Sequence, residues 1–181
     1  MISKLIQVAV ALLCLGAAAA VLRDNGLPTS ASRMPGSGQS RAPAIGAAAP
    51  SFTLQTHRLE DFTLRPAEGA TVLNFWATWC QPCRAEMAQL QAMLESEPES
   101  PRVIAVNLGE SYTPVRKWVE DLGLTFTVLL DPQFSAASLY GVRGLPTTFL
   151  LDSQLMVKRI YFGPVSAAEL LRSIDGIAKG S

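Results

Sequence analysis

Apolar positions follow two alternating patterns from about residue 50 to the end of the chain. Short apolar runs, typical of buried strands, alternate with segments whose apolar residues recur every three or four positions, typical of amphipathic helices. The pattern predicts strands at residues 51–55, 62–65, 71–76, 103–108, 126–130, 147–151 and 157–162, and helices at residues 84–97, 114–122, 134–140 and from 166 onward. Because strands and helices alternate, we expect a mostly parallel sheet with helices on both faces, closed at one edge by a hairpin of the last two strands.

Two of the expected helices carry their own end signals. Thr113 followed by Pro114 predicts an N-cap and a first helical position, and Gly123 predicts the end of that helix. Its apolar stripe consists of Val115, Trp118, Val119 and Leu122. Ser166 and Glu169 have the spacing of a capping box and predict the start of the last helix.

Two cysteines stand between a predicted strand and a predicted helix. The segment Cys80-Gln81-Pro82-Cys83 follows the apolar run at residues 71–76 and opens the helix at 84–97. A helix N-terminus presents unpaired N–H groups that favour a thiolate, and a thiolate is the nucleophile of disulfide exchange. Cys83, Met87, Leu90 and Leu94 share one face of this helix, so we expect Cys83 to point inward and Cys80 to lie nearer the solvent.

Two other uses of a Cys-x-x-Cys pair fit this chain less well. Zinc needs four ligands, and the chain offers only Cys14 and His57 in addition. A purely structural disulfide would close a loop of about four residues and stabilise the fold by roughly 2 kcal/mol, against about 4.7 kcal/mol for a hundred-residue loop. The pair therefore predicts redox chemistry without a bound metal or cofactor.

The N-terminus carries a long apolar stretch. Leu5–Leu22 is interrupted only by Gln7, and as a helix it would span roughly 27 Å, enough to cross the core of a bilayer. Lys4 precedes the stretch, whereas Arg23 and Asp24 cancel behind it. The positive-inside rule therefore places the N-terminus in the cytoplasm and the rest of the chain outside.

These signals divide the chain into three parts. Residues 1–22 are expected to be a signal anchor, with a cleaved signal peptide as the alternative because Ala18-Ala19-Ala20 offers small residues to a peptidase. Residues 23–45, rich in Gly, Pro, Ser and Ala, are expected to be a flexible linker, and residues 46–181 a folded domain. The expected location is the cytoplasmic membrane, crossed once, with the folded domain on the extracytoplasmic side.

Two segments of the chain resemble a known family. Asn74-Phe-Trp-Ala-Thr-Trp-Cys-Gln-Pro-Cys-Arg-Ala-Glu86, followed by Gly144-Leu-Pro-Thr-Thr-Phe149, is similar to the thioredoxin superfamily, and more narrowly to its TlpA/ResA-like branch of membrane-anchored bacterial thiol-disulfide oxidoreductases. The resemblance covers residues 45 to 180. It implies an α/β thioredoxin fold, a central mixed β-sheet flanked by helices, in which residues 113–130 match the helix–strand insertion of this branch.

The resemblance also implies roles for single residues. Cys80 would be the attacking thiol and Cys83 the resolving thiol. Pro146 would be a cis-proline facing the disulfide, with Leu145 offering its backbone to an extended substrate and Trp79 shaping the surface beside the sulfur. Without the resemblance, Pro146 would be an ordinary proline at the start of a strand and Trp79 a partly exposed aromatic at the edge of the core.

One position departs from ordinary cytosolic thioredoxins. Those proteins carry a buried aspartate where this chain has Asn74, whereas the TlpA/ResA-like branch places a glutamate three residues after the second cysteine, and Glu86 stands there. On the helix Glu86 lies about 60° from Cys83, at the edge of the buried face. We expect its carboxyl group to resist ionisation and to relay a proton to Cys83. The alternative is a solvated helix glutamate.

The expected function is the reduction of protein disulfides outside the cytoplasm. No histidine or lysine lies between the cysteines to stabilise the Cys80 thiolate, which favours an electron donor over a strong oxidant. The resemblance implies disulfide-containing client proteins, among them apocytochrome c, and re-reduction by a membrane thiol transporter. Fifteen basic and fifteen acidic residues give a net charge of zero, so no nucleic-acid partner is expected. The expected oligomeric state is a monomer.

Three alternative functions compete with the expected reduction of client disulfides. A thioredoxin-fold copper chaperone would bind Cu(I) through thiolates, but its relatives space the cysteines by three residues and add a later histidine. A general envelope redox protein would have the same chemistry without a cytochrome client. A peroxide-reducing enzyme would need a Pro-x-x-x-Thr pattern before its cysteine, and this chain lacks it.

Overall fold

The computed structural model describes residues 42–96 and 101–179. The strands of this part are β1 (Thr53–Thr56), β2 (Asp61–Thr63), β3 (Thr71–Trp76), β4 (Arg102–Leu108), β5 (Thr127–Asp131), β6 (Thr147–Leu151) and β7 (Val157–Phe162). The helices are α2 (Gln81–Ser96), α3 (Tyr112–Asp121), α4 (Ser135–Leu139) and α5 (Ala167–Lys179). Each strand and helix lies within a few residues of the position that the apolar pattern predicts.

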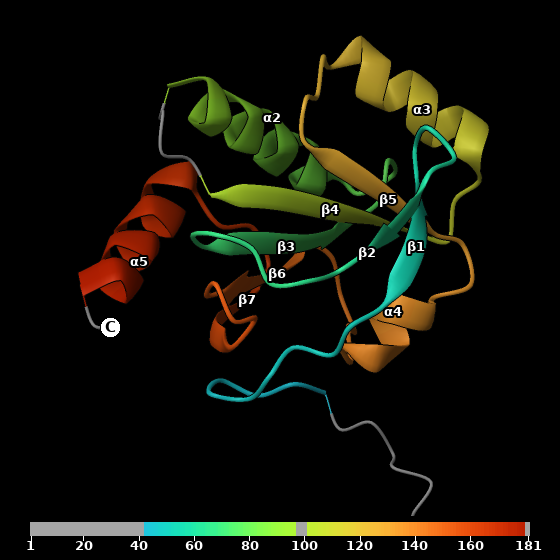
Figure 1. The fold of residues 1–181 in the computed structure, drawn as a ribbon. Coiled ribbons are helices and arrows are strands. Elements are labelled where there is room, and N and C mark those ends of the chain that lie inside the picture. Colours follow the sequence, from blue (N-terminus) through green and yellow to red (C-terminus); the bar gives the residue numbers. More distant parts are fainter. Residues whose placement is uncertain (1–41, 97–100, 180–181) are drawn as a thin grey trace, which may run out of the picture. The chain divides into compact units, whose positions relative to one another are not determined.

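The seven strands form one mixed sheet in the order β2-β1-β5-β4-β3-β6-β7 (Figure 1). Only β3, β4 and β5 run parallel to one another, and the other four neighbouring pairs are antiparallel. The mixed sheet is therefore confirmed, whereas the expectation of a mostly parallel sheet was wrong. A buried strand is an apolar run in a parallel pair and in an antiparallel pair. The apolar pattern therefore indicates burial and not strand direction.

Helices cover both faces of the sheet. Figure 1 shows α2 and α3 on one side of the sheet and α4 on the other. The first face packs an apolar cluster that contains both cysteines and receives side chains from α2, α3 and α5. The second face packs against α4 and against the chain before and around β1 and β2. Side chains alternate along β3 between the two clusters, with Val72 and Trp76 in the first and Leu73 and Phe75 in the second.

The start of α3 differs from the prediction. Ser111 is the N-cap and the helix begins at Tyr112, so the assignment of Thr113 as the N-cap was wrong. Pro114 is then the third helical residue, where the missing N–H is still one that no helical carbonyl would accept. Proline is tolerated anywhere in the first turn, and its position therefore locates a helix start only to within two residues.

The end of α3 follows the prediction more closely. Gly123 adopts a left-handed φ of 62°, which stops the helix at low steric cost. Leu122 is the C-cap and is 38% exposed, so it does not belong to the buried stripe of α3, which contains Val115 and Val119. The stripe ends one turn earlier than the sequence pattern suggested.

Most of the predicted N-terminal parts lie outside the described residues. This holds for the anchor at residues 1–22 and for all but residues 42–45 of the linker. Within residues 42–96 and 101–179 no helix is long and apolar enough to cross a membrane.

Candidate active site

Cys80 and Cys83 form a disulfide at the N-terminus of α2. Cys80 precedes the first helical residue, and its carbonyl oxygen accepts a hydrogen bond from the N–H of Arg84 at 3.3 Å. Its Sγ accepts the N–H of Cys83, the third helical residue, at 3.3 Å. Cys80 therefore uses its sulfur as an N-cap in the way that serine uses its hydroxyl. The same donors, together with the helix dipole, are available to a Cys80 thiolate after reduction.

The two cysteine residues differ little in exposure. Cys83 has no exposed surface and Cys80 is 4% exposed, so Cys80 is the more accessible residue by a small margin. Both belong to the apolar cluster under α2. The order of the attacking and resolving thiols stays a prediction.

The Leu145–Pro146 peptide bond is cis. Pro146 is buried and Leu145 is half-buried, packed against the cluster that contains both cysteines. The carbonyl of Pro146 accepts the N–H of Gly163 at 2.9 Å, which ties this segment to the end of β7. Among the described residues nothing hydrogen-bonds to the backbone of Leu145. Trp79, 72% exposed, is the other large apolar side chain of the predicted substrate surface.

Glu86 is buried inside the fold, with 2% of its surface exposed, so the reading as a solvated helix residue was wrong. Its Oε2 accepts the Asn74 side-chain amide at 3.1 Å, and its Oε1 accepts the backbone N–H of Val165 at 3.2 Å. The hydroxyl of Thr148 lies 3.5 Å from Oε1 and also accepts the Asn74 amide at 2.8 Å. Asn74 and Thr148 are paired residues of β3 and β6, which places them side by side under α2.

Burial raises the pKa of Glu86 from 4.5 to about 7, because desolvation of the carboxylate outweighs the hydrogen bonds that stabilise its charge. A carboxyl group with this pKa carries a proton in about half of the molecules at neutral pH, which suits a proton donor and acceptor. Glu86 lies three residues after Cys83 and therefore near it on the same helix. The side-chain carbonyl oxygen of Asn74, Oδ1, is also buried and has no hydrogen-bond partner among the described residues.

A second carboxyl group, which was not predicted, contacts the turn before the disulfide. Glu110 follows β4, and its Oε2 accepts the N–H of Thr78, two residues before Cys80, at 2.7 Å. Its Oε1 accepts the Thr78 hydroxyl, and its Oε2 also accepts the Asn107 side-chain amide at 2.7 Å. The C-terminal ends of the parallel strands β3 and β4 meet at one edge of the sheet, and this signal could have located Glu110 beside the cysteine segment.

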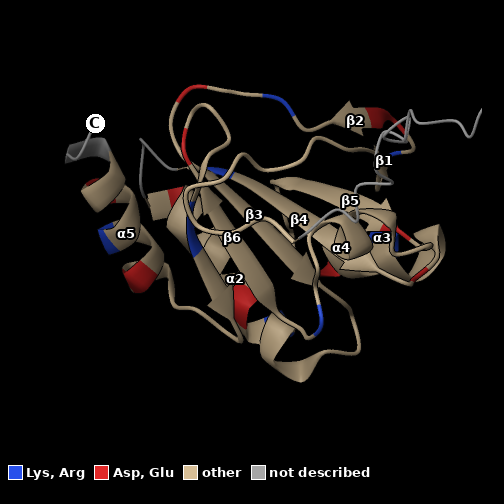
Figure 2. Ribbon diagram, turned by 90° about the horizontal axis from the view of Figure 1, so that it is seen from below, with Lys and Arg blue, Asp and Glu red and all other residues tan. Residues whose placement is uncertain are grey.

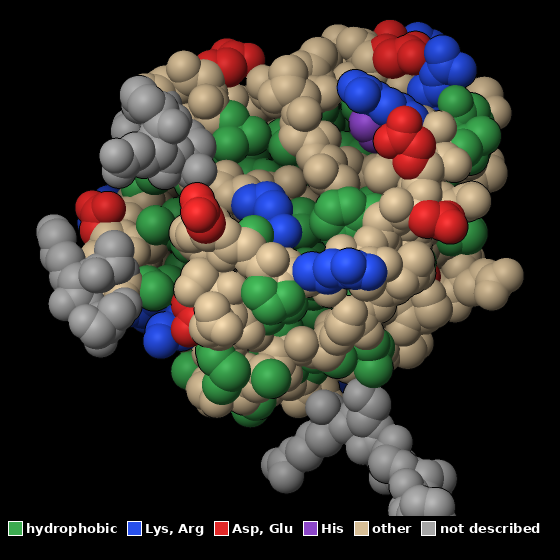
Figure 3. Space-filling model, viewed as in Figure 1, with side chains coloured by type: hydrophobic (Ala, Val, Ile, Leu, Met, Phe, Trp, Pro, Cys, Tyr) green, Lys and Arg blue, Asp and Glu red, His purple; other side chains and the backbone are tan. Residues whose placement is uncertain are grey.

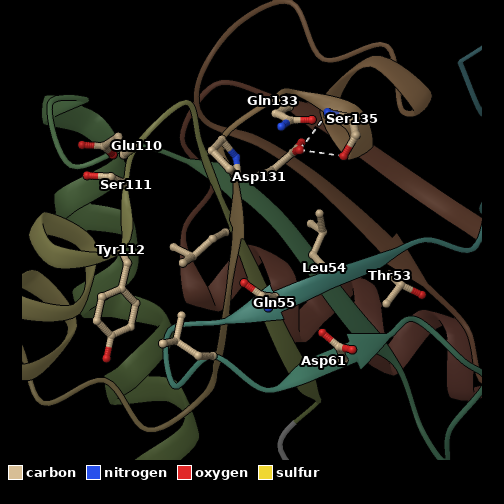
Figure 4. A pocket seen from close by; sticks show the side chains of 13 residues that line it. Thr53, Leu54, Gln55, Asp61, Glu110, Ser111, Tyr112, Asp131, Gln133 and Ser135 are labelled. Carbon is tan, nitrogen blue, oxygen red and sulfur yellow. Dashed lines mark hydrogen bonds between the residues drawn. The ribbon is translucent and has the colours of Figure 1, made fainter.

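Glu110 also lines a cavity of about 420 Å³ (Figure 4). It lies between β1, the end of β5 and the start of α3, and neither cysteine lines it. Asp131 at its wall accepts the backbone N–H and the hydroxyl of Ser135, at 2.7 and 2.8 Å, and so caps α4 (Figure 4). The cavity is a feature separate from the disulfide.

Charged side chains are interspersed over the described part of the molecule. Figure 2 shows basic and acidic residues scattered along the fold, and the face in Figure 3 carries both signs with apolar side chains between them. This distribution agrees with the net charge of zero. It offers no concentrated field on that face to attract a strongly charged polymer.

The disulfide at a helix N-terminus, the cis-proline segment and the mixed sheet together define a thioredoxin-fold thiol-disulfide oxidoreductase, whose substrates are disulfide-containing client proteins. Residues 45–160 match the AhpC/TSA family. The chain is 36% identical over 142 residues to the thiol-disulfide oxidoreductase ResA of Geobacillus thermodenitrificans. The aligned region covers 75% of this chain and 79% of that protein. The chain is also 36% identical over 134 residues to the thioredoxin-like protein YneN of Bacillus subtilis, covering 72% and 78% respectively.

The crystal structure of StoA from Bacillus subtilis matches 70% of this chain and 97% of its own, with a TM-score of 0.61 and 28% identity. The chain therefore belongs to the AhpC/TSA family, on its ResA-like side. These findings confirm the resemblance, the thioredoxin fold and the enzyme class. They do not bear on the roles assigned to single residues, which remain predictions.

Proposed function

We propose that this oxidoreductase works as a reductant of client disulfides. The observation that carries the proposal is the buried carboxyl group of Glu86 one helical turn from Cys83, with a pKa of about 7. Once ionised, it disfavours a second negative charge on the nearby sulfurs. Among the described residues no basic side chain hydrogen-bonds to either cysteine. When the thiolate is weakly stabilised, the reduced form is less favoured relative to the disulfide, and the dithiol is the better electron donor.

The reduction proceeds in two exchanges. The Cys80 thiolate attacks one sulfur of the client disulfide, forming a mixed disulfide and releasing the other client sulfur as a thiolate, which takes a proton from water. The Cys83 thiol then gives its proton to the Glu86 carboxylate and attacks Cys80 in the mixed disulfide. The second client sulfur leaves and is protonated in turn. The client gains two electrons and two protons, and Cys80 and Cys83 return to the disulfide.

We infer that the clients include the haem-binding Cys-x-x-Cys-His segment of apocytochrome c. The TlpA/ResA-like resemblance supports this inference, and so does the Leu145 backbone, which makes no hydrogen bond among the described residues and would pair with an extended client segment. The reduced chain should reduce a peptide with an oxidised Cys-x-x-Cys-His segment at least about tenfold faster than it reduces oxidised glutathione. Equal rates for the two substrates would favour a general envelope redox protein instead.

We further propose that residues 1–22 anchor the chain in the cytoplasmic membrane, with its folded domain outside and a membrane thiol transporter as its electron source. The apolar stretch and its flanking charges support this topology. A reporter fused after Ser181 that is active only outside the cytoplasm should work, and a reporter that needs the cytoplasm should fail. The reverse result would contradict the topology. Recovery of the full-length chain in the membrane fraction would distinguish an anchor from a cleaved signal peptide.

A further inference from the structure

Glu110 is the only described residue whose side chain hydrogen-bonds to the turn before the disulfide. Its carboxylate accepts both the N–H and the hydroxyl of Thr78. The side-chain amide of Asn107, a fully buried residue of β4, donates to the same carboxylate at 2.7 Å. Besides the chain itself, which continues from β3, the Glu110 side chain therefore links the turn to Asn107 of β4. Hydrogen bonds to an ionised acceptor are stronger and more directional than neutral ones.

The turn presents Trp79 to the solvent. The carbonyl of Ala77 accepts the N–H of Cys80 at 3.2 Å, so Thr78 and Trp79 are the central residues of this turn. Trp79 is 72% exposed and belongs to neither apolar cluster. Its position is thus set by the backbone of the turn rather than by packing of its own ring. What holds Thr78 in place also determines where Trp79 points.

Cys80 closes this turn through its N–H, but it has further contacts of its own. Its Sγ accepts the N–H of Cys83, its carbonyl accepts the N–H of Arg84, and its side chain is buried under α2. These contacts belong to the helix and do not involve Glu110. Loss of the Glu110 carboxylate should therefore loosen Trp79 far more than it displaces the attacking sulfur.

We propose that Glu110 is a positioning residue for client docking, which acts through Thr78 to fix the turn that presents Trp79 beside the disulfide. The inference rests on the proposed reduction of client proteins. A mobile Trp79 would have to be ordered each time a client binds, and that entropic cost falls on binding rather than on the exchange of sulfurs. Glu110 would thus affect the KM for a protein client and leave the chemical step unchanged.

The test compares Glu110→Gln with the parent, both as full chains in a mild detergent, in the reduction of insulin with dithiothreitol as the electron source. We expect the KM for insulin to rise at least about threefold and kcat to change less than about twofold. The rate at which iodoacetamide alkylates Cys80 in the reduced chain should change less than about twofold, because a small reagent needs no docking surface. The amide hydrogen of Thr78 should exchange faster.

Asp152→Asn is the matched control. The Asp152 carboxylate also accepts two backbone N–H groups of a turn, those of Gln154 and Met156 at 3.0 and 2.9 Å. This turn joins β6 to β7 at the far end of β6 from Pro146. The control variant should leave the KM for insulin unchanged.

A double-mutant comparison decides whether Glu110 acts through Trp79. In a Trp79→Ala chain, Glu110→Gln should raise the KM no further, because the side chain that it positions is gone. Additive effects would overturn the proposal, as would an unchanged KM, or a joint fall in kcat and in the alkylation rate. If the parent chain reduced neither insulin nor the peptide with the oxidised Cys-x-x-Cys-His segment, the proposed function would be refuted. In that case an unchanged exchange rate of the Thr78 amide in Glu110→Gln would still refute the role of Glu110.

Discussion

The buried Glu86 should make the stability of the oxidised protein depend on pH in a way that Glu86→Gln removes. Folding raises the pKa of this carboxyl group from 4.5 to about 7. Between these values the folded state holds a proton that the unfolded chain has released, so the free energy of unfolding falls as the pH rises. The contribution of the protonated Glu86 to the free energy of unfolding is complete below about pH 4.5. It is lost once the pH has passed 7. At about 1.4 kcal/mol for each pKa unit, the total is about 3 kcal/mol.

The assay is urea unfolding of the oxidised full chain in a mild detergent, followed by tryptophan fluorescence from pH 4.5 to 8. All three tryptophans, Trp76, Trp79 and Trp118, lie in the described fold, so the signal reports on it. In the oxidised chain Cys80 and Cys83 do not titrate. We expect Glu86→Gln to match the parent within about 1 kcal/mol at pH 4.5 and to exceed it by about 3 kcal/mol at pH 8.

Two comparisons sharpen this test. A glutamine at position 86 can still accept the N–H of Val165, and its amide can be accommodated if Asn74 turns to present the Oδ1 that has no partner among the described residues. Glu95→Gln, which removes an exposed carboxyl group from the same helix, controls for the loss of one glutamate as such. If the parent and Glu86→Gln differed by a constant amount across the whole pH range, the reasoning about Glu86 would be wrong.

Three further predictions concern the thiols and their surroundings. Cys83→Ser should accumulate mixed disulfides with client proteins on non-reducing gels, whereas Cys80→Ser should not; equal trapping by both variants would refute the assigned order of attack. In the reduced chain, Glu86→Gln should lower the pH at which iodoacetamide alkylates Cys80, because a negative neighbour has been removed, and a profile identical to that of the parent would rule out the coupling. Asn74→Asp would place a second carboxyl group against Glu86. The free energy of unfolding in urea should fall by roughly 1–3 kcal/mol at pH 8, and the loss should shrink as the pH falls. A loss independent of pH would contradict the charge argument.

Local patterns in the sequence located most of the fold. The strands at residues 71–76, 147–151 and 157–162 have the predicted bounds, because each is mainly a run of β-branched, aromatic and other apolar residues bounded by turn residues, which Lys158 and Arg159 interrupt only in the last strand. The strand directions could not be obtained in this way, since a buried strand has the same composition in a parallel and an antiparallel pair. The start of α3 was misplaced because proline is tolerated throughout a first helical turn.

The environment of the disulfide depends on contacts between distant segments. The helical period placed Glu86 at the rim of the buried face, whereas its hydrogen bonds to Asn74, Thr148 and Val165 close it off from water. Nothing in the spacing of one helix reveals that two strands and a loop converge on it. Glu110 escaped the sequence analysis for the same reason, because its partner Thr78 is 32 residues away along the chain.

The convergence on Glu86 also limits what protein engineers could transplant. A segment such as residues 79–96, grafted onto another sheet, would bring both thiols and the helix N-terminus that supports them. It would lack Asn74 on β3, Thr148 on β6 and the backbone of Val165 before α5. Without these groups Glu86 would not be buried, and its pKa would not be raised. Such a chimera would exchange disulfides with an ordinary, water-exposed glutamate beside them. The raised pKa of Glu86 therefore depends on several distant segments of the fold, whereas the two thiols and the helix N-terminus belong to one segment of the chain.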